Sequence, residues 1–212
     1  EDVDTLRRSP QIEGFKVRGL EVLLLADPVD EFWLPVVGAF NEKTFTSVTR
    51  GTTDLDAFAA ADKDGKTGAA DEAKKEVPGV DQLIAAFKLS LGEVVKDVRR
   101  SDRLTDSPVC LVADAGDMDM NLERLLKRHQ QLGDAGSTPR ILEVNAGHPL
   151  IARLAELSKN DTDDKDGKGG ETLADAAWLL LDQARIVEGE HPPDPAAFSR
   201  RLSAMIEKGL AV

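Results

Sequence analysis

The sequence predicts a mixed α/β (α+β) fold in two parts, and two observations support this prediction. Short β-branched apolar runs, typical of strands, alternate with longer segments whose apolar residues recur at helical spacing. Between residues 62 and 76, by contrast, the chain carries five acidic residues and four lysines, a composition typical of a solvated connection. We therefore expect a small α/β unit over residues 1–60, a polar linker over 61–77 and a larger mixed unit over 78–212.

The clearest helix of the first unit begins near residue 28. Asp27 is a favourable N-cap, Pro28 suits the first helical position, and Asp30 adds negative charge where the helix dipole is positive. Apolar residues then recur with the period of one helical face, which predicts a helix over 29–40. Pro35 within it marks a kink or an early stop.

Three shorter elements are expected around this helix. Ser9-Pro10 opens a short helix that Gly19 ends, and an apolar run just before Asp27 predicts a strand over 22–26. Weak alternation over 44–49 suggests a further strand.

The second unit is expected to fold around a three-stranded sheet. Its strands are the apolar runs at 94–98, 109–113 and 141–144. The acidic, glycine-containing segment 158–171 has the composition of a disordered loop. Apolar periodicity, with Gly92 and Gly133 as stops and Asp194 as a cap, predicts five helices: 80–91, 117–132, 149–157, 172–187 and 195–210.

Composition excludes several classes of function. A formal net charge of −12 argues against binding to nucleic acid or to an anionic membrane surface. No apolar run approaches the roughly 20 residues that a membrane span needs. Cys110 is the single cysteine, so no intrachain disulfide can form, and a reducing cytoplasm is the simplest location. Because the chain starts at Glu1 without an initiator Met, we expect it to be a fragment.

The sequence offers no catalytic or metal-binding constellation. Gly65-Lys66-Thr67 resembles the end of a phosphate-binding loop, but position 60, where the motif needs glycine, is Ala60. The acidic clusters lack the ligand spacing of a calcium-binding loop, and the three histidines lie far apart. We therefore predict no catalytic residue, no metal site and no cofactor in this chain, and expect its function to reside in binding surfaces.

One candidate surface is the apolar stripe of the helix predicted over 117–132. Its members are Met118, Leu122, Leu125 and Leu126. Such a stripe normally packs in the core of its own domain. The alternative is an exposed patch, in which methionine and leucine could adapt to varied partners.

The second candidate is the pair of helices at the end of the chain. The first is apolar around much of its circumference, and the second carries an apolar stripe of its own. Packing against a second copy would complete a four-helix bundle about a two-fold axis, and we favour this interpretation. The alternative is that both helices dock on the preceding sheet.

Five segments, in order along nearly the whole chain, carry a family resemblance: Ser9-Pro10-Gln11-Ile12-Glu13; the stretch 19–32, which includes Asp27-Pro28-Val29-Asp30-Glu31-Phe32; Val95-Lys96-Asp97-Val98-Arg99; Arg103-Leu104-Thr105-Asp106-Ser107-Pro108; and Leu179-Leu180-Leu181-Asp182-Gln183-Ala184. Together they resemble the bacterial, HtpG-type members of the ninety-kilodalton heat-shock chaperone family. The resemblance implies that residues 1–60 are the C-terminal α/β part of the family's middle domain and that 78–212 are its C-terminal dimerisation domain.

The resemblance also implies a function and its residues. The family is an ATP-driven clamp that acts on unfolded or partly folded client proteins. Its ATP and Mg site lies in an N-terminal domain that this chain lacks, so we expect no ATPase activity here. The implied client-binding residues are Met118, Leu122, Leu125 and Leu126, and the implied dimer-interface residues are Trp178, Leu181, Phe198, Leu202 and Ile206.

The implied partners are a second copy of the chain, unfolded clients and bacterial co-chaperones. Two alternatives remain open at this point: a dimerisation scaffold without client contact, and a stand-alone α/β enzyme domain that the sequence does not reveal.

Overall fold

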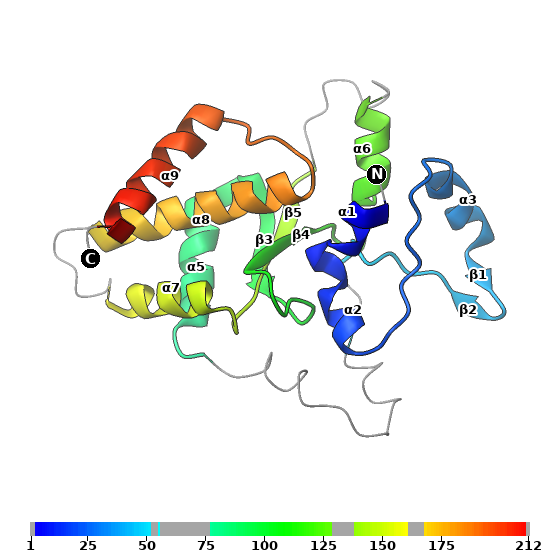
Figure 1. Ribbon diagram of the computed structural model, residues 1–212, viewed down its shortest axis with the longest axis horizontal. Coiled ribbons are helices and arrows are strands. Elements are labelled where there is room, and N and C mark those ends of the chain that lie inside the picture. The colour runs from blue at the N-terminus through cyan, green and yellow to red at the C-terminus, as the bar shows by residue number, and fades with distance from the viewer. Residues whose placement is uncertain (1–2, 52–54, 56–76, 129–137, 161–167, 211–212) are drawn as a thin grey trace.

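The computed structural model describes residues 3–51, 55, 77–128, 138–160 and 168–210, and its centre is a small sheet (Figure 1). The strands are β3 (Val95–Arg100), β4 (Val109–Val112) and β5 (Arg140–Val144), in the order β3-β5-β4. β5 runs parallel to β3 and antiparallel to β4. This arrangement confirms the predicted three-stranded sheet.

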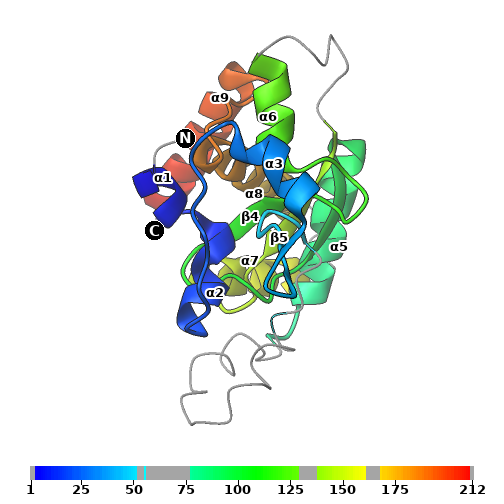
Figure 2. The same cartoon turned by 90° about the vertical axis from the view of Figure 1, so that its right-hand side faces the viewer.

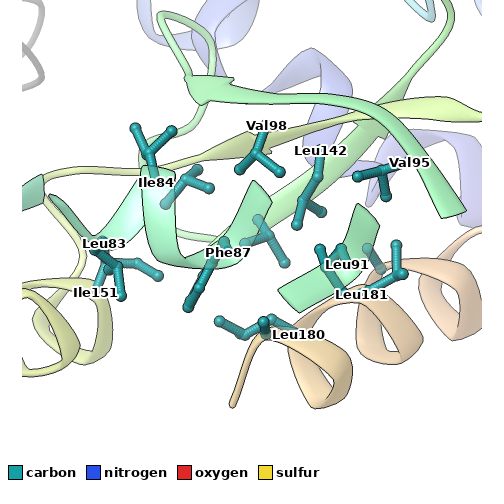
Figure 3. Close-up of a cluster of buried hydrophobic side chains, with 14 of the residues drawn as sticks. Leu83, Ile84, Phe87, Leu91, Val95, Val98, Leu142, Ile151, Leu180 and Leu181 are labelled. Carbon is teal, nitrogen blue, oxygen red and sulfur yellow. The ribbon is translucent and has the colours of Figure 1, made fainter. Parts of the chain in front are cut away.

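The sheet is covered by helices on one face. α5 (Val80–Leu91), α7 (Pro149–Asn160) and α8 (Lys168–Val187) pack together there (Figure 1). Every residue of β4 and β5 is buried, which explains why these strands are apolar runs without alternation. The buried residues of α5 follow one helical face and belong to the core that the sheet, α7 and α8 share (Figure 3 labels all of them except Val80): Val80, Leu83, Ile84, Phe87 and Leu91.

The N-terminal segment closes the free edge of β4. It contains α1 (Val3–Arg7), the 3₁₀-helix η1 (Pro10–Ile12) and α2 (Glu13–Val17). Gln11 Nε2 donates a hydrogen bond of 2.8 Å to the carbonyl of Leu111, and residues 49–51 continue the pairing beyond the end of the strand. An otherwise open strand edge is thereby satisfied within the chain.

A second attachment joins α2 to the loop after β3. One oxygen of Glu13 accepts hydrogen bonds from the backbone N–H groups of Thr105 (2.8 Å), Asp106 (2.9 Å) and Ser107 (3.2 Å). Its other oxygen accepts from the Ser107 hydroxyl at 2.6 Å. A Cβ added at Gly14 would lie 2.7 Å from the backbone of Arg103, so glycine permits this close approach. The buried part of this segment therefore packs on the second unit, while the division at residues 1–60 and 78–212 stays a prediction.

The expected strand over 22–26 was wrong. These residues have no regular secondary structure and are partly exposed, and no strand among the described residues pairs with them. Apolarity alone cannot make a strand without a partner for its backbone groups.

The expected helix over 29–40 is shorter in the structure. α3 spans Asp30–Val37 and ends at Gly38, whose φ of +64° stops it. Pro35 lies inside α3 rather than ending it. The next residues form a hairpin of β1 (Ala39–Phe40) and β2 (Lys43–Thr44), so the strand expected over 44–49 shrinks to its first residue. α3 and this hairpin lie at the end of the molecule opposite α9 (Figures 1 and 2).

The later helices are close to the prediction. α5 and α9 (Pro195–Leu210) have the expected bounds, and a short 3₁₀-helix η2 (Gly92–Val94) follows α5. α6 spans Met120–Arg128, α7 is longer than predicted at its C-terminus, and α8 starts four residues earlier than predicted. The linker 61–76, residues 129–132 of the predicted helix and residues 161–167 of the predicted loop lie outside the described residues.

Candidate functional site

The start of α6 is fixed by a capping residue. Asp119 Oδ1 accepts a hydrogen bond from the backbone N–H of Asn121 at 2.9 Å, and Oδ2 accepts from the hydroxyl of Thr49 at 2.7 Å. The helix therefore begins at Met120, which is 2% exposed and belongs to the core. Met118 precedes the helix and is 37% exposed.

The predicted stripe is thus divided. Leu122, Leu125 and Leu126 remain on α6 and are half-buried, whereas Met118 lies in the segment before it. None of these four belongs to the described core clusters, so the structure supports neither a fully buried stripe nor a fully exposed one. Apolar periodicity placed the start of the helix too early, because Asp119 caps it through the N–H of Asn121 and so leaves Met118 outside it.

A small cavity of about 60 Å³ lies beside α6. Leu125 and Arg124 of α6 line it together with Leu6 of α1, with Asp27 and Pro28 of the segment that leads into α3, and with Glu31 of α3 itself. Leu125, one residue of the candidate client face, thus lies across a small cavity from residues 25–28, which we call the Asp27 segment. Asp27 itself accepts a hydrogen bond of 3.0 Å from the N–H of Val29, as expected for a residue that starts the turn before α3.

The inner side of α6 is held by ion pairs. Glu123 is buried and accepts from Arg140 of β5, and Lys127 Nζ lies 2.7 Å from Glu123 Oε1. Burial alone would raise the pKa of the Glu123 carboxyl, but the hydrogen bond from Lys127 and the charges of Arg140 and Lys127 together hold that pKa below its usual value of 4.5. The pair fixes α6 to the central strand.

The terminal hairpin leaves one helix face uncovered. Within the part of the chain that the structure describes, no side chain of α9 is fully buried, and α9 packs mainly against α8 (Figure 1). Leu202 is 40% and Ile206 is 53% exposed, one helical turn apart on the same face.

The other predicted interface residues contribute within the chain. Trp178 is half-buried, and the guanidinium carbon of Arg201 lies 5.0 Å from the centre of its ring, a cation–π contact between α8 and α9. Phe198 is also half-buried. Leu181 is 1% exposed and lies in the core with α5 (Figure 3), so its side chain is not available to a partner in this conformation.

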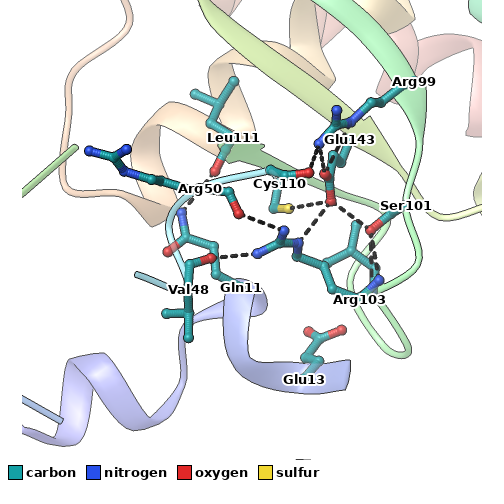
Figure 4. A network of polar contacts seen from close by, with 12 residues as sticks. Gln11, Glu13, Val48, Arg50, Arg99, Ser101, Arg103, Cys110, Leu111 and Glu143 are labelled. Atoms are coloured by element: carbon teal, nitrogen blue, oxygen red, sulfur yellow. Dashed lines mark hydrogen bonds and ion pairs between the residues drawn. The ribbon is translucent and has the colours of Figure 1, made fainter. Parts of the chain in front are cut away.

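A buried polar network that sequence reasoning missed lies on the other face of the sheet (Figure 4). Glu143 of β5 accepts from Arg103 Nε at 3.0 Å, from Arg99 Nη2 at 2.7 Å and from the Ser101 hydroxyl at 3.0 Å. Cys110 is buried beside it, and burial with the nearby Glu143 charge raises the pKa of the thiol. The sequence did contain one indication of this network, because Glu143 is a charged residue inside the otherwise apolar run 141–144.

Comparison with known proteins assigns the family. The family described as Hsp90 protein matches residues 1–212 of the chain. The chain belongs to the Hsp90 family. Among its relatives, the chaperone protein HtpG of Roseobacter denitrificans is 51% identical over 212 residues, and that of Paramagnetospirillum magneticum is 50% identical over 212 residues. HtpG of a Wolbachia species from Brugia malayi is 40% identical over 206 residues.

These matches confirm the resemblance at the level of the family. Each alignment covers 97% or more of this Hsp90 chain but only 31–32% of the relative, so the chain spans about a third of the length of the curated relatives it matches. The relatives are named chaperones. Among the described residues of the Hsp90 chain, no helix is long and apolar enough to cross a membrane.

We expect the anchoring of α6 in this Hsp90 chain to weaken in acid. Because the folded-state pKa of Glu123 lies below its unfolded value, its ionised form contributes stability above about pH 4.5, and this contribution is lost as the pH falls through the folded-state pKa. The difference in free energy of unfolding between the native chain and Glu123→Gln should therefore narrow below that pH. Urea unfolding across a pH series measures it, and a difference that stays constant with pH would contradict the prediction.

Proposed function

We propose that this chain supplies homodimerisation and part of the client-binding surface of an ATP-driven molecular chaperone. The whole protein would act as a clamp on unfolded or partly folded proteins, with bacterial co-chaperones as possible further partners. The observation that carries the proposal is the uncovered apolar face of α9, on which Leu202 and Ile206 lie 40% and 53% exposed. Exposed apolar surface at helical spacing is typical of a helix that packs against a partner.

The occupant that fits this face best is a second copy of the chain. α8 and α9 form an antiparallel hairpin, and two such hairpins related by a two-fold axis would form a four-helix bundle. Sedimentation equilibrium at micromolar concentration should give twice the mass of one chain. A mass equal to that of a single chain at that concentration would contradict the dimerisation proposal.

Client contact is the second part of the proposal, and it rests on α6. Leu122, Leu125 and Leu126 are half-buried, and Met118 beside them is exposed. A surface of this kind can cover further apolar area when a partner binds, since each buried leucine contributes about 1.5–3 kcal/mol before ordering costs are subtracted.

We expect Leu125→Asp together with Leu126→Asp to weaken suppression of client aggregation by about tenfold. The assay is light scattering of a thermally aggregating model protein, with circular dichroism and melting temperature as checks of the fold. Leu157→Asp is the control, because Leu157 is an apolar residue of α7 that is 37% exposed, and α7 lies on the other side of the molecule from α6 (Figure 1). Loss of the fold in the α6 variant would favour the core interpretation, and unchanged suppression would remove α6 from the client surface.

The nucleotide reaction is assigned to the rest of the protein. Among the described residues there is no group of three or more histidine, cysteine, aspartate or glutamate side chains placed to hold a metal ion. Because the family resemblance puts the ATP and Mg site in another domain, we propose no step of ATP or Mg chemistry for this chain. Calorimetry with ATP tests this directly, and measurable binding would favour the alternative of an unrecognised enzyme domain.

A further inference from the structure

Glu188 lies at the turn between the two helices of the terminal hairpin, α8 and α9. It directly follows α8, and Gly189, with a φ of +77°, turns the chain toward α9. The N–H of Glu190 returns to the carbonyl of Arg185 at 2.9 Å, which closes the helix end. Glu188 itself is buried, so its carboxylate requires partners inside the protein.

One partner of Glu188 comes from α6. Arg124 Nη2 lies 2.7 Å from Glu188 Oε2, and Arg124 Nη1 donates to the Glu188 carbonyl at 3.0 Å. Two contacts from one planar guanidinium fix both the side chain and the backbone of residue 188. Arg124 is followed by Leu125 of the candidate client face, and both line the cavity beside the Asp27 segment.

The other partner comes from the N-terminal segment. Gln11 Nε2 donates to Glu188 Oε1 at 3.0 Å and to the Leu111 carbonyl at 2.8 Å, and it lies 3.7 Å from the sulfur of Met120. Gln11 is buried, as is Met120 at the start of α6. The side chain of Gln11 therefore touches the β4 edge, α6 and the turn of the hairpin at once (Figure 4 shows it beside Leu111).

We propose that Glu188 couples the client face of α6 to the α8–α9 hairpin. If a bound partner shifts α6, Arg124 must either carry Glu188 with it or leave a buried charge without its partner. Leaving the buried Glu188 carboxylate without Arg124 is costly in the low-dielectric interior of the protein. Movement of residue 188 displaces the turn of the hairpin, and Gln11 transmits the same displacement to the N-terminal segment. Binding at α6 and pairing of the hairpins are then linked, and linkage between two binding equilibria is reciprocal.

This inference rests on the proposed dimerisation and client contact, and the experiment separates them. The dimer dissociation constant is measured by sedimentation with and without saturating reduced, carboxymethylated α-lactalbumin as a permanently unfolded client. In the native chain the client should change this constant by about fivefold or more. In Glu188→Gln the chain should still dimerise and still bind the client. The ratio of the dimer dissociation constants measured with and without the client should, however, fall to near one.

The matched control is Glu190→Gln, which removes the same charge two residues later in the same turn and should keep the native ratio. An unchanged ratio in Glu188→Gln, or a ratio of one in a native chain that dimerises and binds, would overturn the coupling.

A second readout needs neither a dimer nor a client. Hydrogen exchange of the α6 amides should accelerate by about tenfold in Glu188→Gln while exchange in α5 stays unchanged. Unaltered exchange in α6 would overturn the inference even if the chain were monomeric. A monomer with accelerated α6 exchange would instead contradict only the proposed dimer.

Discussion

Glu143→Gln is expected to lower the free energy of unfolding by about 3–5 kcal/mol, because it leaves Arg103 buried without its counter-charge. Both side chains of this pair are almost completely buried, and the same carboxylate also accepts from Arg99 and Ser101. The neutral amide cannot balance the Arg103 charge, and its NH₂ group is a donor facing other donors. Urea unfolding at neutral pH measures the loss.

The control for this prediction is another arginine–glutamate ion pair, which is exposed to solvent instead of buried. Glu156 and Arg153 lie 3.0 Å apart on the exposed surface of α7, and Glu156→Gln should change stability by only about 0–1 kcal/mol. Replacing Glu143 and Arg103 together by leucine and methionine should recover much of the loss, because no buried charge of that pair remains. A Glu143→Gln variant as stable as the native chain would contradict the argument.

Ile206→Glu is expected to raise the dissociation constant of the proposed dimer by about 10²- to 10⁴-fold. In a two-fold interface each substitution occurs twice, so two isoleucine side chains are lost, each contributing about 1.5–3 kcal/mol. Each new carboxylate also opposes burial. Sedimentation velocity over a concentration series measures the shift.

Two controls make this result specific to the α9 face. Arg200→Glu changes charge at an exposed position of the same helix but leaves the apolar face intact, and it should leave the dissociation constant nearly unchanged. The far-UV circular dichroism spectrum of the monomeric variant should match that of the native chain, because Ile206 is 53% exposed and contributes little to the chain's own core. A stable dimer in Ile206→Glu would place the interface elsewhere.

Much of the fold could be read from local patterns. α5 and α9 begin and end where apolar spacing, Gly92, Asp194 and Pro195 predicted. The strands β4 and β5 were predictable as buried apolar runs bounded by polar residues. Each of these signals is contained within a few residues of the element that it describes, so tertiary contacts had little to alter.

The failures have different causes. The run at 22–26 has the composition of a strand but lacks a partner among the described residues, whereas α6 starts at Met120 because Asp119 caps it locally. The interior position of Leu181 was also unpredictable. Apolar residues surround much of α8, and only packing against α5 decides which of them face inward.

The sequence alone determined the helices, the strands of the sheet and membership of the Hsp90 family, because each is encoded in spacing and motifs along the chain. Only the tertiary structure decided which surfaces remain open and which polar groups meet. Gln11 contacts Leu111 and Glu188 across 100 and 177 positions, and such partners are chosen by how the elements pack. The physical reason is that periodicity specifies which face of an element is apolar, whereas burial of that face depends on what packs against it.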